Sequence, residues 1–251
     1  LAMHNYHDTF SVFPPGSLGD PSWLGNHNIY DGHFGWPAFI LPFVEQQALH
    51  ERIDFSKRAW TSYQGTDQTA KGDVANQYAA QNMPSVFVCP SAHRAQPENE
   101  FKDYSINAGV HNPSESRCCP ARTLEKNSGP LSRYGIAWYA SRVKMRDISD
   151  GTSNTFMFFD DAHFAWQSSI AWDKGSNPFF YVHHVDEGYG MTANGPNDPT
   201  NEHYRGVYSE HPGGVQASLC DGSVRFVSDT IAYNIWRATF TRSGKESDQL
   251  Q

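Results

Sequence analysis

The side chains best suited to chemistry are concentrated between residues 181 and 211 of this sequence. Histidine titrates near neutral pH, tyrosine exchanges a proton through its hydroxyl, and arginine binds carboxylates, so the mixture suits proton transfer on an anionic substrate. The residues expected to perform this catalysis are His183, His184, Tyr189, His203, Tyr204 and Arg205. The residues expected to bind the substrate are His33, Trp166, Trp172 and Tyr208.

The same stretch also offers ligands for a divalent metal ion. Imidazoles and carboxylates suit transition metals, and the candidates are His183, His184, Asp186, His203 and His211. Calcium prefers carboxylate and carbonyl oxygens, which the segment 194–201 with Asp198 can supply. The sequence contains no His-x-His or His-x3-His spacing, so the pattern leaves the presence and the identity of a metal open.

A third interpretation gives these residues no chemistry and treats them as solvated or packed loop side chains of a structural subunit. Composition limits the choice of partner. Aromatic residues make up 14% of the chain and charged residues 18%, which is typical of a loop-rich extracellular protein. The formal net charge of −8 argues against nucleic acid as a partner, because phosphate binding needs a basic surface. An acidic polysaccharide held by a local basic cluster remains compatible with that charge.

The first part of the chain is expected to supply helices. Apolar positions over residues 1–10 predict a helix that Pro14 ends, since proline cannot continue it. Pro37 opens a second helix that is expected to run to about Ile53, with a kink or its true start at Pro42. The first helix begins without a cap, so we expect an upstream segment, and membrane contact is expected only through that missing N-terminal helix.

The later part of the chain is expected to supply a sheet. The predicted strands are residues 86–90, 103–109, 155–160, 215–220 and 223–227. Asp221-Gly222 between the last two predicts a tight hairpin, and Asp229 is expected to cap a final helix over 230–240. The four cysteines form no Cys-x-x-Cys pair, and either Cys89 pairs with Cys118 or Cys119, or some cysteines stay buried thiols.

Several segments, taken in order, resemble one family. The matching segments are residues 1–8, 13–16, 35–36, 41–47, 89–91, 104–109, 150–155, 211–214 and 221–226. Together they resemble the prepilin-like family of planctomycete-type bacteria, which ends in a His-x9-Asp-Gly motif that His211, Asp221 and Gly222 match here. One departure is that the strand after the Ser-Asn-Thr segment ends in Asp160-Asp161, where the family has Gly-Glu.

This resemblance implies an α+β, type II or type IV pilin-like fold, in which a truncated N-terminal helix packs on an antiparallel sheet with long loop insertions. It implies a single domain over residues 1–251, with a His/Tyr-rich insertion at 163–211, in a secreted, cell-surface or periplasmic protein. It also suggests a polysaccharide lyase that cleaves uronic-acid chains by β-elimination. The alternatives are a non-catalytic pilin subunit and a carbohydrate-binding module.

Overall fold

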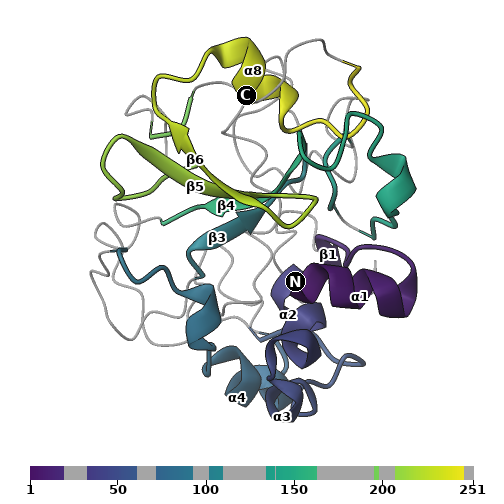
Figure 1. Cartoon of the computed structure of the whole chain (residues 1–251). Coiled ribbons are helices and arrows are strands. Elements are labelled where there is room, and N and C mark those ends of the chain that lie inside the picture. Colours follow the sequence, from purple (N-terminus) through teal and green to yellow (C-terminus); the bar gives the residue numbers. More distant parts are fainter. Residues whose placement is uncertain are drawn as a thin grey trace, which may run out of the picture.

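The computed structural model describes residues 1–19, 33–60, 72–92, 102–109, 134–138, 140–162, 195–197 and 207–245 (Figure 1). At its centre lies an antiparallel sheet in the order β3-β4-β5-β6. Its strands are β3 (Tyr104–Ile106), β4 (Phe156–Asp160), β5 (Gly214–Leu219) and β6 (Val224–Ser228). A smaller sheet pairs β1 (Ser17–Leu18) with β2 (Phe34–Gly35). With the helices around them, these sheets confirm the expected α+β class.

The helices are short. The α-helices are α1 (Ala2–Phe10), α2 (Trp36–Ile40), α3 (Gln47–His50), α4 (Gln77–Ala80) and α8 (Tyr233–Ala238). The 3-10 turns are η2 (Leu41–Val44), η3 (Val74–Asn76), η4 (Ser85–Phe87) and η6 (Met145–Asp147). In the part of the chain that the structure describes, every helix is too short or too polar to cross a bilayer.

The expected helix over residues 1–10 is confirmed as α1, which ends where Ser11 takes a left-handed conformation and donates its N–H to the carbonyl of His7. The second expected helix is broken at the proline that was expected to disturb it. Pro42 has no N–H to give, and the chain passes from α2 through η2 into α3.

The predicted final helix is confirmed as α8, but the predicted strand over 86–90 and the predicted cap of the final helix are wrong. The predicted strand over 86–90 is the 3-10 turn η4, which starts after Pro84 and joins β3 through one backbone bond, from Asp103 N–H to the carbonyl of Phe87. The final helix begins after Ala232 and has no side-chain cap. Asp229 instead accepts a hydrogen bond from the Asn197 amide, which holds it outside the helix.

The predicted hairpin is confirmed. Strands β5 and β6 pair in register from Gly214 opposite Ser228 to Ser218 opposite Val224. The Asp221 carboxylate accepts hydrogen bonds from the backbone N–H and the hydroxyl of Ser223, at 2.8 and 2.7 Å. Gly222 has φ +88°, a value that a side chain disfavours, so this turn needs the glycine that the sequence provides.

The two faces of the main sheet carry different cores, with α8 on one side and α1 and α2 on the other (Figure 1). On the α8 face, Phe156, Trp236 and Phe240 pack edge to face, with ring centroids 4.9–5.6 Å apart. On the opposite face, Trp36 packs against Phe158 at 4.6 Å. The pairing of β4 with β5 shifts register between Phe156 and Phe158, so β4 contributes side chains to both cores, whereas the buried apolar residues of β5 belong to the α8 core.

Candidate functional site

Most residues predicted to carry chemistry lie outside the described residues. These are His183, His184, Tyr189, His203, Tyr204, Arg205, Trp166 and Trp172, and also Asp186 and Asp198. His33 is buried beside β2, in the smaller sheet. Tyr208 is partly exposed at the edge of the main sheet. The two described candidates therefore lie next to different sheets, since His33 precedes β2 and Tyr208 bridges Asp161 just past the end of β4.

Both ends of the predicted insertion at 163–211 meet at the end of β4. Asp161 forms an isolated parallel bridge with Tyr208, and the N–H of Ala162 donates to the carbonyl of Tyr208 at 3.0 Å. Asn197 joins the same place, since its N–H donates to the carbonyl of Val207 at 2.9 Å. The insertion thus leaves and rejoins the sheet at one point.

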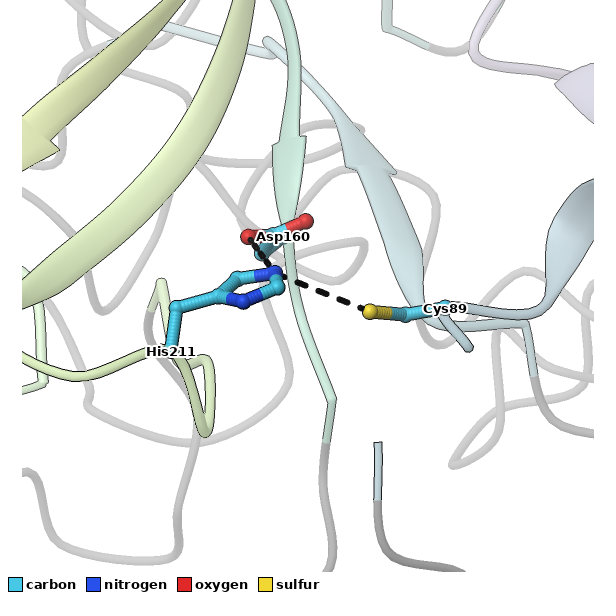
Figure 2. Close-up of side chains that lie close together, drawn as sticks. All are labelled: Cys89, Asp160 and His211. Carbon is cyan, nitrogen blue, oxygen red and sulfur yellow. Dashed lines mark hydrogen bonds and ion pairs between the residues drawn. The ribbon is translucent and has the colours of Figure 1, made fainter. Parts of the chain in front are cut away.

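Three chemically active side chains converge next to this point, and Figure 2 shows them approaching from three segments of the chain. The thiol sulfur of Cys89 lies 3.8 Å from Nε2 of His211. The Oδ2 atom of Asp160 lies 3.5 Å from the same Nε2. Cys89 and Asp160 are buried, and His211 is half-buried. We call these three residues the Cys89 cluster.

Local structure fixes the position of each member. Cys89 follows η4, and its N–H donates to the buried carboxylate of Asp103 at 2.9 Å. Asp160 ends β4, and its Oδ2 accepts a hydrogen bond from the Gln216 N–H at 2.8 Å. His211 precedes the turn into β5, and its N–H donates to the hydroxyl of Ser209 at 2.9 Å.

Burial dominates the electrostatics of the cluster. It raises the pKa of the Asp160 carboxyl, although the Gln216 N–H and His211 oppose this shift. Burial also raises the pKa of the Cys89 thiol, and the nearby carboxylates of Asp160 and Asp103 raise it further. Tyr104 lies opposite Asp160 in the ladder and within hydrogen-bonding reach of Cys89, and burial raises the pKa of its hydroxyl. A thiol in this setting is protonated at neutral pH unless a cation replaces the proton.

This geometry does not match a catalytic triad. In a triad the imidazole uses one nitrogen for the nucleophile and the other for the carboxylate. Here the thiol and the carboxylate both approach Nε2, as the two dashed lines in Figure 2 show. The arrangement instead directs three ligand-type atoms toward one point.

The cluster lies in the wall of an apolar groove with a volume of about 680 Å³. The groove lies between the first turn of α1, the α2–η2 segment and the α1-facing side of β4–β6. Leu1, Val86 and Val224 contribute to its lining and are strongly exposed. His4 also lines it, and a Cβ atom placed on Gly222 would lie 3.7 Å from His4 Nε2, so α1 reaches the β5–β6 turn here. None of the lining residues that the structure describes is a lysine or an arginine.

Sequence reasoning named one member of the cluster, His211, as a candidate metal ligand and missed the other two as its partners. Cys89 and Cys220 are buried free thiols, so the predicted disulfide of Cys89 is wrong and the alternative of buried thiols holds for both. His211 was among the candidate metal ligands, and its side chain faces Asp160 and Cys89, neither of which was in that set. One pattern in the sequence could have indicated the cluster: a polar residue beside a proline or at the end of a strand. Cys89-Pro90, His211-Pro212 and Asp160 have this pattern.

Comparison with curated proteins and with solved structures finds no match. The sequence profile of one family, described as "Protein of unknown function (DUF1559)", matches residues 1–234. That match covers α1, both sheets and every member of the Cys89 cluster. The chain therefore belongs to the DUF1559 family.

Proposed function

We propose that the protein is a non-catalytic, pilin-like assembly subunit at the cell surface, and that its groove receives an apolar α-helix of a neighbouring subunit. The observation that carries this proposal is the open apolar groove between α1 and the sheet. Its exposed lining residues would be buried by such a partner. Fully burying a large aliphatic side chain contributes about 1.5–3 kcal/mol, so the few exposed residues at the rim offer a useful driving force.

The chemistry of the groove favours a protein partner over a sugar. A uronic-acid chain is polyanionic and needs cationic side chains to neutralise it. Among the described residues that line the groove there is no lysine or arginine, and the buried carboxylate of Asp160 lies in its wall. Ridges of apolar side chains on a helix fit such a groove without leaving charges unpaired.

The fold and the family support the same assignment. The motifs in residues 1–16 and 211–226 resemble those of prepilin-like proteins, and DUF1559 membership extends over both segments. The arrangement of a first helix, an antiparallel sheet and a groove between them is suited to helix packing between subunits. Location at the cell surface or in the periplasm is part of this proposal.

A matched pair of variants tests the proposal in the full-length protein. Val224 is 65% exposed at the groove, and Val74 is 69% exposed in η3, away from the groove lining. We expect Val224→Glu to abolish fibres or oligomers seen by electron microscopy and sedimentation, and Val74→Glu to leave them intact. Equal assembly by both variants, or a wild-type protein that stays monomeric under assembly conditions, would refute the proposal.

Polysaccharide lyase is the second candidate, and one observation favours it. The His/Tyr/Arg-rich insertion is anchored at the end of β4 by the Asp161–Tyr208 bridge, next to the Cys89 cluster. Side chains of the insertion can therefore work close to an imidazole and a tyrosine hydroxyl that are suited to proton transfer.

The lyase candidate has its own assay. Hyaluronan, chondroitin, dermatan and heparan chains are incubated with the protein, and unsaturated uronate products are followed by ultraviolet absorbance. A lyase forms such products, and the double variant His203→Ala/Arg205→Ala loses them while His50→Ala does not. Absence of product with all four polymers would end this candidate for these substrates, and binding without product would point to a carbohydrate-binding module.

A further inference from the structure

We infer that Cys89, Asp160 and His211 bind one divalent transition-metal ion of the zinc class, with three protein ligands and a fourth position open to the groove. This inference goes beyond the assembly function and does not depend on it. It rests on the spacing of the ligand atoms, on their burial and on the contacts that hold them.

The ligand atoms have the spacing of a tetrahedral zinc site. Zinc bonds of about 2.0–2.3 Å place neighbouring ligand atoms of a tetrahedron about 3.3–3.6 Å apart. The His211 Nε2 atom lies 3.5 Å from the Asp160 Oδ2 atom and 3.8 Å from the Cys89 sulfur. All three ligand atoms lie within 4.8 Å of one another. Two of the three separations therefore lie close to the tetrahedral values, and the Cys89 sulfur and the Asp160 carboxylate would move toward each other by up to about 1 Å when the ion binds.

When the thiol and the carboxyl are both ionised, hydrogen bonding to the imidazole does not satisfy both of them. Nε2 carries at most one hydrogen, so it can donate to the thiolate or to the carboxylate but not to both. Cys89 and Asp160 are nearly inaccessible to water, which makes an uncompensated charge there expensive. One divalent cation at the common point compensates a thiolate and a carboxylate together and uses the lone pair of a neutral imidazole.

The ligand types select the metal. Thiolate, imidazole and carboxylate are the three ligand classes that zinc accepts in proteins. Magnesium and calcium prefer oxygen ligands only, so a site with a sulfur and a nitrogen discriminates against both. Three protein ligands leave one position for water or for a group of the groove's occupant.

A second layer of contacts holds the ligands in place. The Asp103 carboxylate accepts the N–H of Cys89, and the Gln216 N–H donates to the carboxylate of Asp160. The Tyr104 hydroxyl lies within hydrogen-bonding reach of the Cys89 thiol. Such outer partners orient metal ligands and tune their basicity. The ion would tie together η4, the end of β4 and the segment before β5.

Titration of the metal-depleted full chain with zinc tests the inference. We expect one ion per chain at the Cys89 cluster, and at least about 100-fold weaker binding in Cys89→Ser, Asp160→Asn and His211→Gln, because outer partners alone contribute about 10–100-fold. The control variant Cys220→Ala removes the other buried thiol and is expected to bind normally. Unchanged affinity in all three ligand variants would overturn the inference.

Cysteines and histidines elsewhere in the chain must be separated from this site. Cobalt substituted for zinc in a Cys118→Ser/Cys119→Ser background is expected to keep its thiolate-to-metal absorption, and adding Cys89→Ser is expected to remove it. Loss of the absorption in the Cys118→Ser/Cys119→Ser background itself would assign the sulfur ligand elsewhere and overturn the inference.

A spectroscopic measurement on the unmutated protein tests the site even if the variants fail to fold. X-ray absorption at the zinc edge is expected to show one sulfur at about 2.3 Å and nitrogen or oxygen atoms at about 2.0 Å. A shell without sulfur, or with two or more sulfurs, contradicts the assignment. Because these measurements use the unassembled chain, a failure of the assembly proposal leaves their outcome unaffected.

Discussion

The two faces of the main sheet differ in how completely they are covered. On the α8 face, Phe156, Phe159, Trp236 and Phe240 are almost fully buried and contact one another ring to ring. On the other face, α1 and α2 cover only part of the sheet and leave the apolar groove open. The same strands therefore have one face that is covered by the chain itself and one face that is partly open to a partner.

This difference separates stability from function. The covered face contains apolar side chains that are almost fully buried and in contact with one another. The open face holds exposed apolar residues together with a buried thiol, a buried carboxylate and an imidazole. Natural proteins place poorly satisfied groups where they bind something, so the open face is the place to look for a partner and an ion.

The largest expected effect comes from the covered face. Trp236→Ala removes the largest fully buried side chain and is expected to lower the free energy of unfolding by about 3–5 kcal/mol. Phe226→Ala, on the open side of β6, is expected to change it by less than about 1 kcal/mol. Urea denaturation of the two variants measures the contrast. Equal losses would show that the open face is as important for stability as the covered one.

Thiol reactivity offers a second contrast. Cys89 lines the groove, whereas Cys220 is fully buried and its thiol donates to the carbonyl of Phe156. In a Cys118→Ser/Cys119→Ser background without metal, we expect Cys89 to react with an uncharged thiol reagent at least about 100-fold faster than Cys220, a difference of about 2.7 kcal/mol. Mass spectrometry of labelled peptides gives both rates. Faster labelling of Cys220 would mean that the core around Cys220 opens more easily than the groove.

A smaller effect is expected from Asp160→Asn. The change removes a buried charge, and the amide oxygen can still accept the Gln216 N–H. We expect the metal-free protein to keep its stability or gain about 1 kcal/mol, and to lose any increase in Tm on adding zinc. The exposed-carboxylate control Asp229→Asn is expected to leave the zinc effect unchanged. A large loss of stability in metal-free Asp160→Asn would assign this carboxylate to the fold instead of the ion.

The smallest expected effect is a pH dependence at the β5–β6 turn. Hydrogen bonds from the hydroxyl and the N–H of Ser223 lower the pKa of Asp221 below its ordinary value of 3.8. The folded state then binds fewer protons, so this contribution is complete above pH 3.8 and is lost as the pH falls through the lowered pKa. Solvent screening limits it to about a few tenths of a kcal/mol. Denaturation of wild type and Asp221→Ala at pH 7 and near pH 2 measures it, and a difference that grows in acid would contradict it.

Local patterns in the sequence predicted local structure well. Asp221-Gly222 predicted its hairpin because the turn is decided by the residues within it. The run of apolar residues at β4 predicted a strand, and the spacing of apolar positions over residues 1–10 predicted a helix. Both predictions rest on local patterns in the same way. The apolar residues after Pro84 predicted a strand. The segment forms no ladder with a neighbouring described strand and instead forms the 3-10 turn η4.

The Cys89 cluster was beyond such patterns. Cys89 and His211 are 122 residues apart, and only the order of the strands brings them together. The single-domain prediction over 1–251, the lyase site in the insertion and its acidic polysaccharide partner stay predictions, because they depend on residues outside those that the structure describes. Their chemistry was argued from residue types, which do not decide spatial arrangement.

The bridge between Asp161 and Tyr208 makes the position after β4 a tolerant site for inserting foreign sequence. The two ends of the connecting chain are held together by the sheet, so a connector of another length changes little in the folded core as long as Asn197 keeps its bonds to Val207 and Asp229. Doubling a flexible connector costs only about 0.6 kcal/mol in closure entropy. Relatives can therefore differ in the length and sequence of this connector. The same point can be used to insert a peptide or a second domain beside the groove.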